Sequence, residues 1–364
     1  MNAETTPLEE RLITLIRANG PISLADYMSD ALGHPHEGYY TTQTAIGAGG
    51  DFTTAPEISQ IFGELIGLWL VQSWIDIGEP DMFNLVEFGP GRGVLMADIL
   101  RTARIKPEFL NAANIYMVET SGRLRHEQQR RLRDERSAID WVDSFSDVPE
   151  GPTLIVANEF FDCLPIRQYE RKPEGWRERL VGLREDQLGL AFTHAPTPPP
   201  PDVLLPPKAT TPEDTIIEIC DDQAELTEAI ARRLIENTGR ALIIDYGRVK
   251  SGPGETLQAV RSHEYWPVLS APGRADITAH VDFEAINCVA IESGAGTFGP
   301  VAQGEFLQSL GLAVRIERLC AQKSPEEQAK IHAGAHRISS PSQMGETFKT
   351  LCISSPDLSP PSGF

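Results

Sequence analysis

Cysteine is scarce in this chain. The five cysteines are an odd number without a CxxC pair, and they are scattered along the sequence at Cys163, Cys220, Cys288, Cys320 and Cys352. This pattern indicates neither a disulfide framework nor a cysteine-based metal site, and it suits a reducing compartment. The histidines also lack an HExxH arrangement. We therefore predict that the protein holds no metal.

Long hydrophobic runs are missing too. No apolar stretch approaches the roughly 20 residues that span a membrane as a helix. The first residues, MNAETTPLEERLITLI, carry acidic residues early, without the cationic start and apolar core of a signal peptide or the Arg-rich composition of a transit peptide. From these absences we predict a cytoplasmic protein without membrane insertion.

Basic residues are outnumbered. The chain has 32 Lys and Arg against 52 Asp and Glu, which gives a formal net charge of −20 over 364 residues. Nucleic-acid binding relies on clustered Lys and Arg, so we expect no nucleic-acid partner. The hydrophobic content of 41% and the charged content of 23% are ordinary for a globular protein. A chain of this length is sufficient for one large domain or two modest ones.

The order of apolar segments favours an α/β fold. Short buried strands are expected near 84–88, 114–118, 153–157 and 241–245, with helical segments between them. Alternating strands and helices predict a parallel, doubly wound sheet.

Helical and antiparallel segments are expected around this sheet. Residues 8–33 show helical periodicity with a break at Pro21, and residues 58–78 are expected to form a strongly apolar helix. An antiparallel insertion is expected at about 166–212, where hairpin patterns end in a proline-rich spacer. The segments 313–319 and 347–355 are expected to be antiparallel edge strands.

These patterns suggest two regions. Residues 1–80 would form an N-terminal helical and lid region, and residues 81–364 would form the main domain with its insertion. The Gly-, Thr- and Pro-rich stretch 34–56 is expected to be a loop with at most short strands. Its glycine content would permit it to close over a ligand as a lid.

The stretch NLVEFGPGRG at 84–93 is the most informative in the chain. Between an expected strand and an expected helix, Gly89, Gly91 and Gly93 alternate with other residues, the first of which is Pro90. Glycine tolerates positive φ and lets a ligand touch the backbone. The spacing is GxGxG and not the GxGxxG of dinucleotide sites, because Val94 occupies the sixth position. The loop therefore favours S-adenosylmethionine over a pyrophosphate cofactor.

Acidic residues beside this loop fit the same cofactor. Glu87 can face the positive charge of a sulfonium or an ammonium group. Glu119 follows the next expected strand, where a carboxylate can take both ribose hydroxyls, although it could instead only cap the following helix. We predict that Glu87, Glu119, Asn158 and the glycine loop bind the cofactor.

A second acidic loop follows the strand at 153–157. The sequence ANEFFDCLP places Asn158, Glu159 and Asp162 at the carboxyl end of a central strand, where open α/β sheets bind ligands. Enzymes that methylate exocyclic amines or glutamine commonly carry an NPPY-type loop here, and this chain departs from it. Two carboxylates can hold a guanidinium and then accept its proton. We predict that Glu159 and Asp162 are catalytic, with turn capping as the alternative.

Two further groups could contribute to the site. Asp51, Thr53 and Glu57 are candidates for substrate contacts or a lid, although Asp51 could be only an Asx-turn former. His280 stands between acidic residues and could serve acid–base chemistry near neutral pH, or it could be structural.

Several separate motifs together resemble the MidA family of S-adenosylmethionine-dependent methyltransferases. They are HPHEGYY at 34–40, GDFTTAPEISQIFGELIGLW at 50–69, VEFGPGRG at 86–93, NEFFDCLP at 158–165, DITAHVDF at 276–283 and QGEFLQSLG at 303–311. The resemblance implies a Rossmann-like class I methyltransferase fold that binds S-adenosylmethionine through Glu87, Gly89, Gly91, Gly93 and Glu119. It also implies that the segments 50–64 and 158–162 line the cleft.

The family resemblance also implies a reaction and a partner. It implies arginine methylation of a protein, and the mitochondrial enzyme of the family acts on the large hydrophilic subunit of respiratory complex I. A complex I subunit or a similar protein is therefore the expected partner. Two alternatives remain at this point: an assembly chaperone that keeps the cofactor pocket without catalysis, and a methyltransferase acting on a small molecule.

Overall fold

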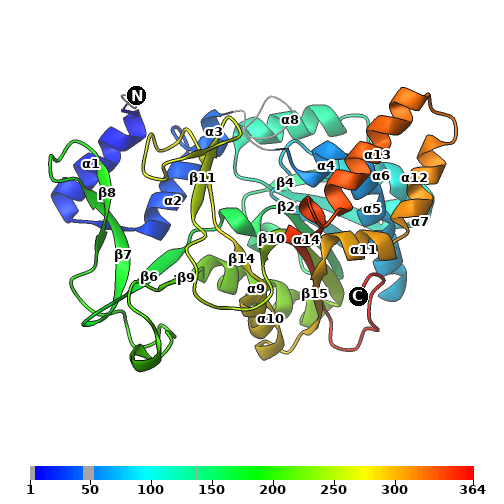
Figure 1. Ribbon diagram of the computed structural model, residues 1–364. Coiled ribbons are helices and arrows are strands. Elements are labelled where there is room, and N and C mark those ends of the chain that lie inside the picture. The colour runs from blue at the N-terminus through cyan, green and yellow to red at the C-terminus, as the bar shows by residue number, and fades with distance from the viewer. Residues whose placement is uncertain (1–4, 44–52, 136–137) are drawn as a thin grey trace.

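The computed structural model describes residues 5–43, 53–135 and 138–364 (Figure 1). Its largest sheet has the order β15, β16, β10, β5, β2, β3, β4, and β14 pairs with the end of β10. The bounds are β2 Phe83–Phe88, β3 Ala113–Val118, β4 Ile139–Val142, β5 Thr153–Asn158, β10 Gly239–Arg248, β14 Val281–Asp282, β15 Gly296–Ala302 and β16 Phe348–Ser354. The four strands predicted from the sequence are confirmed as β2, β3, β5 and β10.

This sheet is mostly parallel. The strands β4, β3, β2, β5 and β10 pair in parallel, and β16 pairs antiparallel with both β10 and β15. Successive side chains of a strand point to opposite faces, so each apolar strand supplies two cores. Leu85, Val156 and Leu242 face one core, while Val86, Ile155 and Ile243 face the other. The predicted doubly wound sheet is confirmed.

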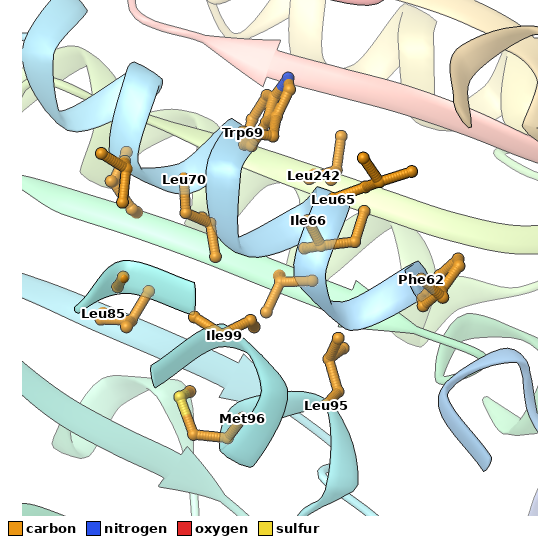
Figure 2. Packing of buried hydrophobic residues seen from close by; sticks show 14 of the residues in the cluster. Phe62, Leu65, Ile66, Trp69, Leu70, Leu85, Leu95, Met96, Ile99 and Leu242 are labelled. Atoms are coloured by element: carbon orange, nitrogen blue, oxygen red, sulfur yellow. The ribbon is translucent and has the colours of Figure 1, made fainter. Parts of the chain in front are cut away.

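Helices cover both faces of the sheet. One face packs against α5, α6 and α11 to α13, and the other packs against α9 and α10. The bounds are α5 Gln60–Asp76, α6 Val94–Ala103, α7 Pro107–Ala112, α8 Gly122–Leu132, α9 Asp221–Asn237, α10 Phe283–Glu292, α11 Gln303–Ser309, α12 Leu312–Cys320, α13 Pro325–Ser339 and α14 Met344–Thr347. Figure 2 shows α5 and α6 packed against each other in front of the strands, with Ile66 and Leu70 of α5 above Ile99 of α6 in this view.

The N-terminal helices pack on a second, antiparallel sheet. Helices α1 Pro7–Asn19 and α2 Leu24–Gly33 share an apolar cluster with this sheet and with β13. The sheet has the order β1, β7, β6, β9, with β8 on β7. Its strands are β1 Ile22–Ser23, β6 Arg167–Lys172, β7 Gly175–Leu183, β8 Leu190–His194 and β9 Ile216–Ile219, and a third sheet joins β11 Gln258–Arg261, β12 Glu264–Trp266 and β13 Asp276–Thr278. The predicted helical appendage and antiparallel insertion are confirmed, while the domain boundaries stay a prediction.

Some predicted elements are corrected by the structure. The segment 313–319 is not an edge strand but lies in α12, because its apolar side chains continue from Leu312 with helical spacing to Ile316 and Leu319. A strand at 347–355 is confirmed as β16, but its predicted edge position is wrong, because β16 lies between β10 and β15 and β15 is the outer strand. The stretch 34–56, expected to be a loop, contains the single helical turn α3 Tyr39–Thr42 in its described part, and a second turn, α4 Ala55–Ile58, begins in its last two residues.

Candidate active site

A cavity opens where the strand order of the central sheet reverses. The chain leaves β2 toward β3 on one side and leaves β5 toward β10 on the other, and this switch point is where open α/β sheets bind ligands. The cavity has a volume of about 430 Å³, and a pocket of about 40 Å³ adjoins it. Residues shared by both linings are Thr54, Gly89, Gly91 and Glu159.

The glycine loop forms the floor of this cavity through a backbone that only glycine adopts readily. Gly89, Gly91 and Gly93 have φ angles of 54°, 54° and 73°. A Cβ on Gly89 would lie 2.6 Å from Cδ2 of Phe160, so the two loops approach each other closely. Gly93 is the N-cap of α6. The first turn of α6 therefore begins at the cavity, as the sequence predicted for a strand-to-helix cofactor loop.

Gln128, which the sequence reasoning missed, joins the glycine loop to Glu119. Its fully buried side chain donates from Nε2 to the Gly91 carbonyl at 2.8 Å and to Oε2 of Glu119 at 3.1 Å. The indole of Trp141 donates to Oε1 of Gln128 at 2.8 Å, which fixes the orientation of the amide. Glu119 also accepts a 2.8 Å hydrogen bond from the Ser121 backbone. The sequence signal for Gln128 is its position, because it lies four residues from Leu124 and from Leu132 and therefore on the same inner face of α8.

Glu87 and Asn158 present buried oxygen atoms toward the same region. No described residue donates a hydrogen bond to Oε2 of Glu87 or to Oδ1 of Asn158. Burial raises the pKa of the Glu87 carboxyl well above its usual range, and the negative charge of Glu119 adds to this shift. An unpartnered buried carboxylate requires a cation or a donor. The ammonium and sulfonium groups of S-adenosylmethionine supply both, so these residues fit that cofactor.

Cofactor binding is expected to be coupled to proton release from Glu87. Its raised pKa leaves it protonated at low pH, and only the ionised form attracts a cation. The affinity for S-adenosylmethionine should therefore increase as the pH rises from the ordinary titration range of a glutamate through this raised pKa. Calorimetry in buffers of different ionisation enthalpy measures the released proton. Glu87→Gln should weaken binding at least tenfold and abolish that release.

S-adenosylhomocysteine provides the comparison for this prediction, because it keeps the ammonium but lacks the sulfonium charge. An equal pH dependence for both compounds would place Glu87 at the ammonium, and a dependence seen only with S-adenosylmethionine would place it at the sulfonium. A pH dependence that persists in the Glu87→Gln variant would contradict the assignment.

The second acidic loop lies beside the glycine loop, because it follows β5, the strand that pairs with β2. Glu159 adopts a φ of 50° directly after β5, and its Oε1 accepts a 2.9 Å hydrogen bond from the Ala55 backbone. Burial raises the pKa of Glu159 to about 7. Asp162 is 7% exposed, and burial raises its pKa to about 6. Both carboxylates line the cavity, so the structure brings together the two residues predicted to be catalytic.

Asp245, at the carboxyl end of β10, holds this loop in place and was not found from the sequence. It is fully buried, and its Oδ2 accepts hydrogen bonds from three consecutive backbone N–H groups, those of Phe160, Phe161 and Asp162, at 3.0 to 3.2 Å. Its Oδ1 accepts a fourth from the Tyr246 backbone. Burial raises the pKa of Asp245, and these backbone donors oppose that shift.

The far wall of the cavity comes from the N-terminal segment and from β13. The Tyr40 hydroxyl donates to Oδ1 of Asp276 at 2.9 Å, and both residues line the cavity beside Asp162. The Ser121 hydroxyl donates to the Tyr40 carbonyl at 2.9 Å, which joins this wall to the start of α8. Carboxylates from two elements therefore face one end of the cavity.

The remaining predicted site residues have separate places. Thr53 is half-buried next to the lining residue Thr54, and Glu57 lines the smaller pocket, where its Oε2 lies 3.5 Å from Nη1 of Arg92. Asp51 lies outside the described residues, so the lid role of 34–56 stays a prediction. His280 is exposed, packs against the Tyr246 ring and is not among the described residues that line either cavity. The structure does not bring it together with Glu159.

Over residues 5–43, 53–135 and 138–364, no group of three or more His, Cys, Asp or Glu side chains is arranged to hold a metal ion. No helix in the same ranges has the length and apolar character needed to cross a membrane.

Residues 65–301 match the family described as "Putative S-adenosyl-L-methionine-dependent methyltransferase". The fold resembles a protein from Burkholderia thailandensis solved with bound S-adenosyl-homocysteine, with a TM-score of 0.84 and 24% identity over 98% of this chain and 93% of that one. At that identity the likeness supports the fold. The Rossmann-like methyltransferase fold expected from the MidA resemblance is thereby confirmed.

Curated relatives extend the match to nearly the whole chain. It is 36% identical to the mitochondrial protein arginine methyltransferase NDUFAF7 of Mus musculus, over 96% of this chain and 85% of that protein. The Homo sapiens protein of the same name is 34% identical over 96% and 83%. The predicted cytoplasmic localisation is contradicted, because these relatives are mitochondrial proteins. The cavity, the family match and these relatives agree that the chain belongs to the family of S-adenosylmethionine-dependent methyltransferases.

Proposed function

We propose that the protein transfers a methyl group from S-adenosylmethionine to an arginine side chain of a protein, with Glu159 and Asp162 as the groups that bind and deprotonate the guanidinium. The observation that carries this proposal is the acidic end of the cavity, where these two carboxylates and Asp276 gather without a described Lys or Arg in the lining. The related NDUFAF7 proteins are named protein arginine methyltransferases, which supports the same acceptor.

The glycine loop, Glu87, Glu119 and Asn158 are the residues that we propose to hold the cofactor. When bound, S-adenosylmethionine supplies an electrophilic methyl group on a sulfonium. Glu119 is held by Ser121 and Gln128, so its carboxylate is positioned before a ligand arrives. Glu87 neutralises positive charge, and Gln128 fixes the Gly91 carbonyl and with it the loop.

The loop carboxylates supply orientation and a proton acceptor. A guanidinium stays protonated in water, with a pKa above roughly 12, so its nitrogen becomes nucleophilic only when a nearby base takes the proton. Paired carboxylates can bind the guanidinium through two N–H donors and fix the direction of the third nitrogen. The raised pKa values of Glu159 and Asp162, about 7 and about 6, make them stronger proton acceptors than exposed carboxylates. Orientation and deprotonation then account for most of the catalysis.

Our proposal for the acceptor protein rests on the family resemblance. The MidA resemblance points to a subunit of respiratory complex I or a similar protein. A search for methylarginine by mass spectrometry, comparing cells with and without the protein, identifies the modified residue and tests this assignment directly.

Removing the charges of the acidic loop is expected to separate catalysis from cofactor binding. The double change Glu159→Gln with Asp162→Asn keeps size while removing both proton acceptors. Transfer of tritiated methyl from S-adenosylmethionine to protein, in a lysate of cells lacking this protein, should fall at least 100-fold. Calorimetry should show cofactor affinity within about threefold of the unaltered protein, because Glu87 and Glu119 remain.

A matched control removes two exposed carboxylates that are not among the residues lining the cavity or the smaller pocket. Glu228→Gln with Asp221→Asn on α9 should leave transfer unchanged, since these side chains are 56% and 60% exposed. Methyl transfer to the small-molecule fraction alone would contradict a protein acceptor. Cofactor binding without transfer to any fraction would favour the chaperone alternative.

A further inference from the structure

Helices α5, α6 and α12 lie at the right of Figure 1. Residues of these helices, with others beside them, line a further concavity. Its volume is about 480 Å³, and none of its lining residues lines the cofactor cavity or the smaller pocket. We name it the α12 groove and define it by the side chains that carry the argument: Leu68, Ile105 and Val314, with Arg101, Arg315 and Arg318.

Aliphatic side chains from three different elements are exposed in this groove. Leu68 of α5, Ile105 after α6 and Val314 of α12 are 36%, 68% and 54% exposed. Single exposed aliphatic residues are ordinary on a protein surface, whereas several that converge in one concavity indicate a contact surface.

Arginines border these aliphatic side chains. The buried carboxylate of Glu64 joins two of them, with Oε1 at 3.1 Å from Arg101 and Oε2 at 2.6 Å from Arg315. Asp98 forms an ion pair with the other terminal nitrogen, Nη1, of Arg101. Arg318 is exposed and forms no ion pair with any residue of the described ranges. The local balance is therefore positive, with three arginines against two carboxylates, although the whole chain has a net charge of −20.

We propose that the α12 groove docks an apolar, acid-bearing segment of the protein that is methylated, and this inference rests on the proposed function. Carboxylates of the segment would meet Arg318 and Arg315, and its aliphatic side chains would cover Val314 and Ile105. Complementary charge guides encounter and suppresses wrong partners, while the apolar contacts slow dissociation. A docking surface separate from the cavity lets the enzyme select its protein independently of the arginine that enters the active site.

Helix α5 connects the two surfaces. It begins at Gln60, directly after the α4 turn that includes the pocket residues Pro56 and Glu57, and it carries Leu68 to the groove two turns later. The groove and the active site therefore lie along one buried helix, and a single acceptor protein can reach both.

The test compares a groove variant with a matched variant on α9. The double change Val314→Asp with Arg318→Glu replaces an exposed aliphatic side chain of the groove with a carboxylate and reverses the charge of an exposed arginine. Ile235→Asp with Arg232→Glu makes the same exchange at residues that are 38% and 62% exposed on the surface of α9. At low lysate concentration the groove variant should transfer at least tenfold less tritiated methyl to protein. The α9 variant should match the unaltered protein, and both variants should keep the affinity for S-adenosylmethionine.

A second measurement does not depend on methyl transfer. Benzoylphenylalanine in place of Ile105 should cross-link in cells to a protein segment that contains aliphatic residues and at least two Asp or Glu. Arg318→Glu should remove that cross-link. Cross-links only to a second copy of the chain or to lipid, or none at all, would overturn the proposal, as would undiminished transfer by the groove variant. If the unaltered protein transfers no methyl group to protein, the proposed function fails. The cross-link then tests by itself whether the α12 groove binds a protein segment.

Discussion

Gly91→Val is expected to weaken binding of S-adenosylmethionine at least 100-fold. Gly91 lines both the cavity and the adjoining pocket with a φ of 54°, a conformation that β-branched residues rarely adopt. The change costs about 1 to 3 kcal/mol of backbone strain. It also places a side chain where we propose that the cofactor contacts the backbone, and a loss of about 2.7 kcal/mol is already a 100-fold change in affinity. Calorimetry with purified protein measures the effect.

The control for this substitution separates backbone strain from obstruction of the cavity. Gly20 follows α1 with a φ of 89°, and a Cβ there would meet no atom within 4 Å. Gly20→Val should lower the thermal unfolding midpoint while leaving cofactor affinity intact. Unaltered affinity in Gly91→Val would remove the glycine loop from the binding site.

Asp245→Ala is expected to abolish methyl transfer without a comparable loss of cofactor binding. The change leaves the N–H groups of Phe160, Phe161 and Asp162 without their shared acceptor, at about 1 to 3 kcal/mol for each group that stays buried and unpaired. The loop that orients Glu159 and Asp162 would lose its anchor. Transfer should fall at least 100-fold and cofactor affinity less than tenfold.

Because the alanine variant could unfold, Asp245→Asn gives a milder test. The amide keeps one acceptor oxygen for the loop and loses the second acceptor for the Tyr246 N–H group. We expect a folded protein with a lower kcat and an unchanged KM for S-adenosylmethionine. Asp282→Ala is the control, since it removes the aspartate that caps α10 and pairs with Arg248. It should lower stability and leave kcat unchanged, and equal losses of kcat in both variants would contradict a positioning role for Asp245.

The sequence predicted the central sheet and the glycine loop because both depend on local patterns. Continuous apolar runs identified β2, β3, β5 and β10, and the alternating glycines marked the turn where the backbone needs positive φ. The acidic loop at Glu159 and Asp162 followed from its position after a central strand.

What the sequence could not predict depends on contacts between distant segments. Asp245 bonds to N–H groups more than 80 residues earlier, and nothing local to ALIIDYG indicates that contact. Gln128 reaches Gly91 across 37 residues. The error at 313–319 has a different origin, since Val314 and Ile316 alternate with arginine and glutamate like an edge strand, while Leu312, Ile316 and Leu319 follow a helix.

The two walls of the large cavity have separate origins in the chain. The floor belongs to the central sheet and its glycine loop, whereas Gly33, Tyr40 and Asp276 come from segments that pack on the smaller sheets. Exchange of residues in these outer segments would leave the floor that we propose to bind the cofactor intact. Related enzymes could thus acquire new methyl-acceptor substrates through substitutions on one side of the cleft, while the residues proposed to bind the methyl donor stay the same.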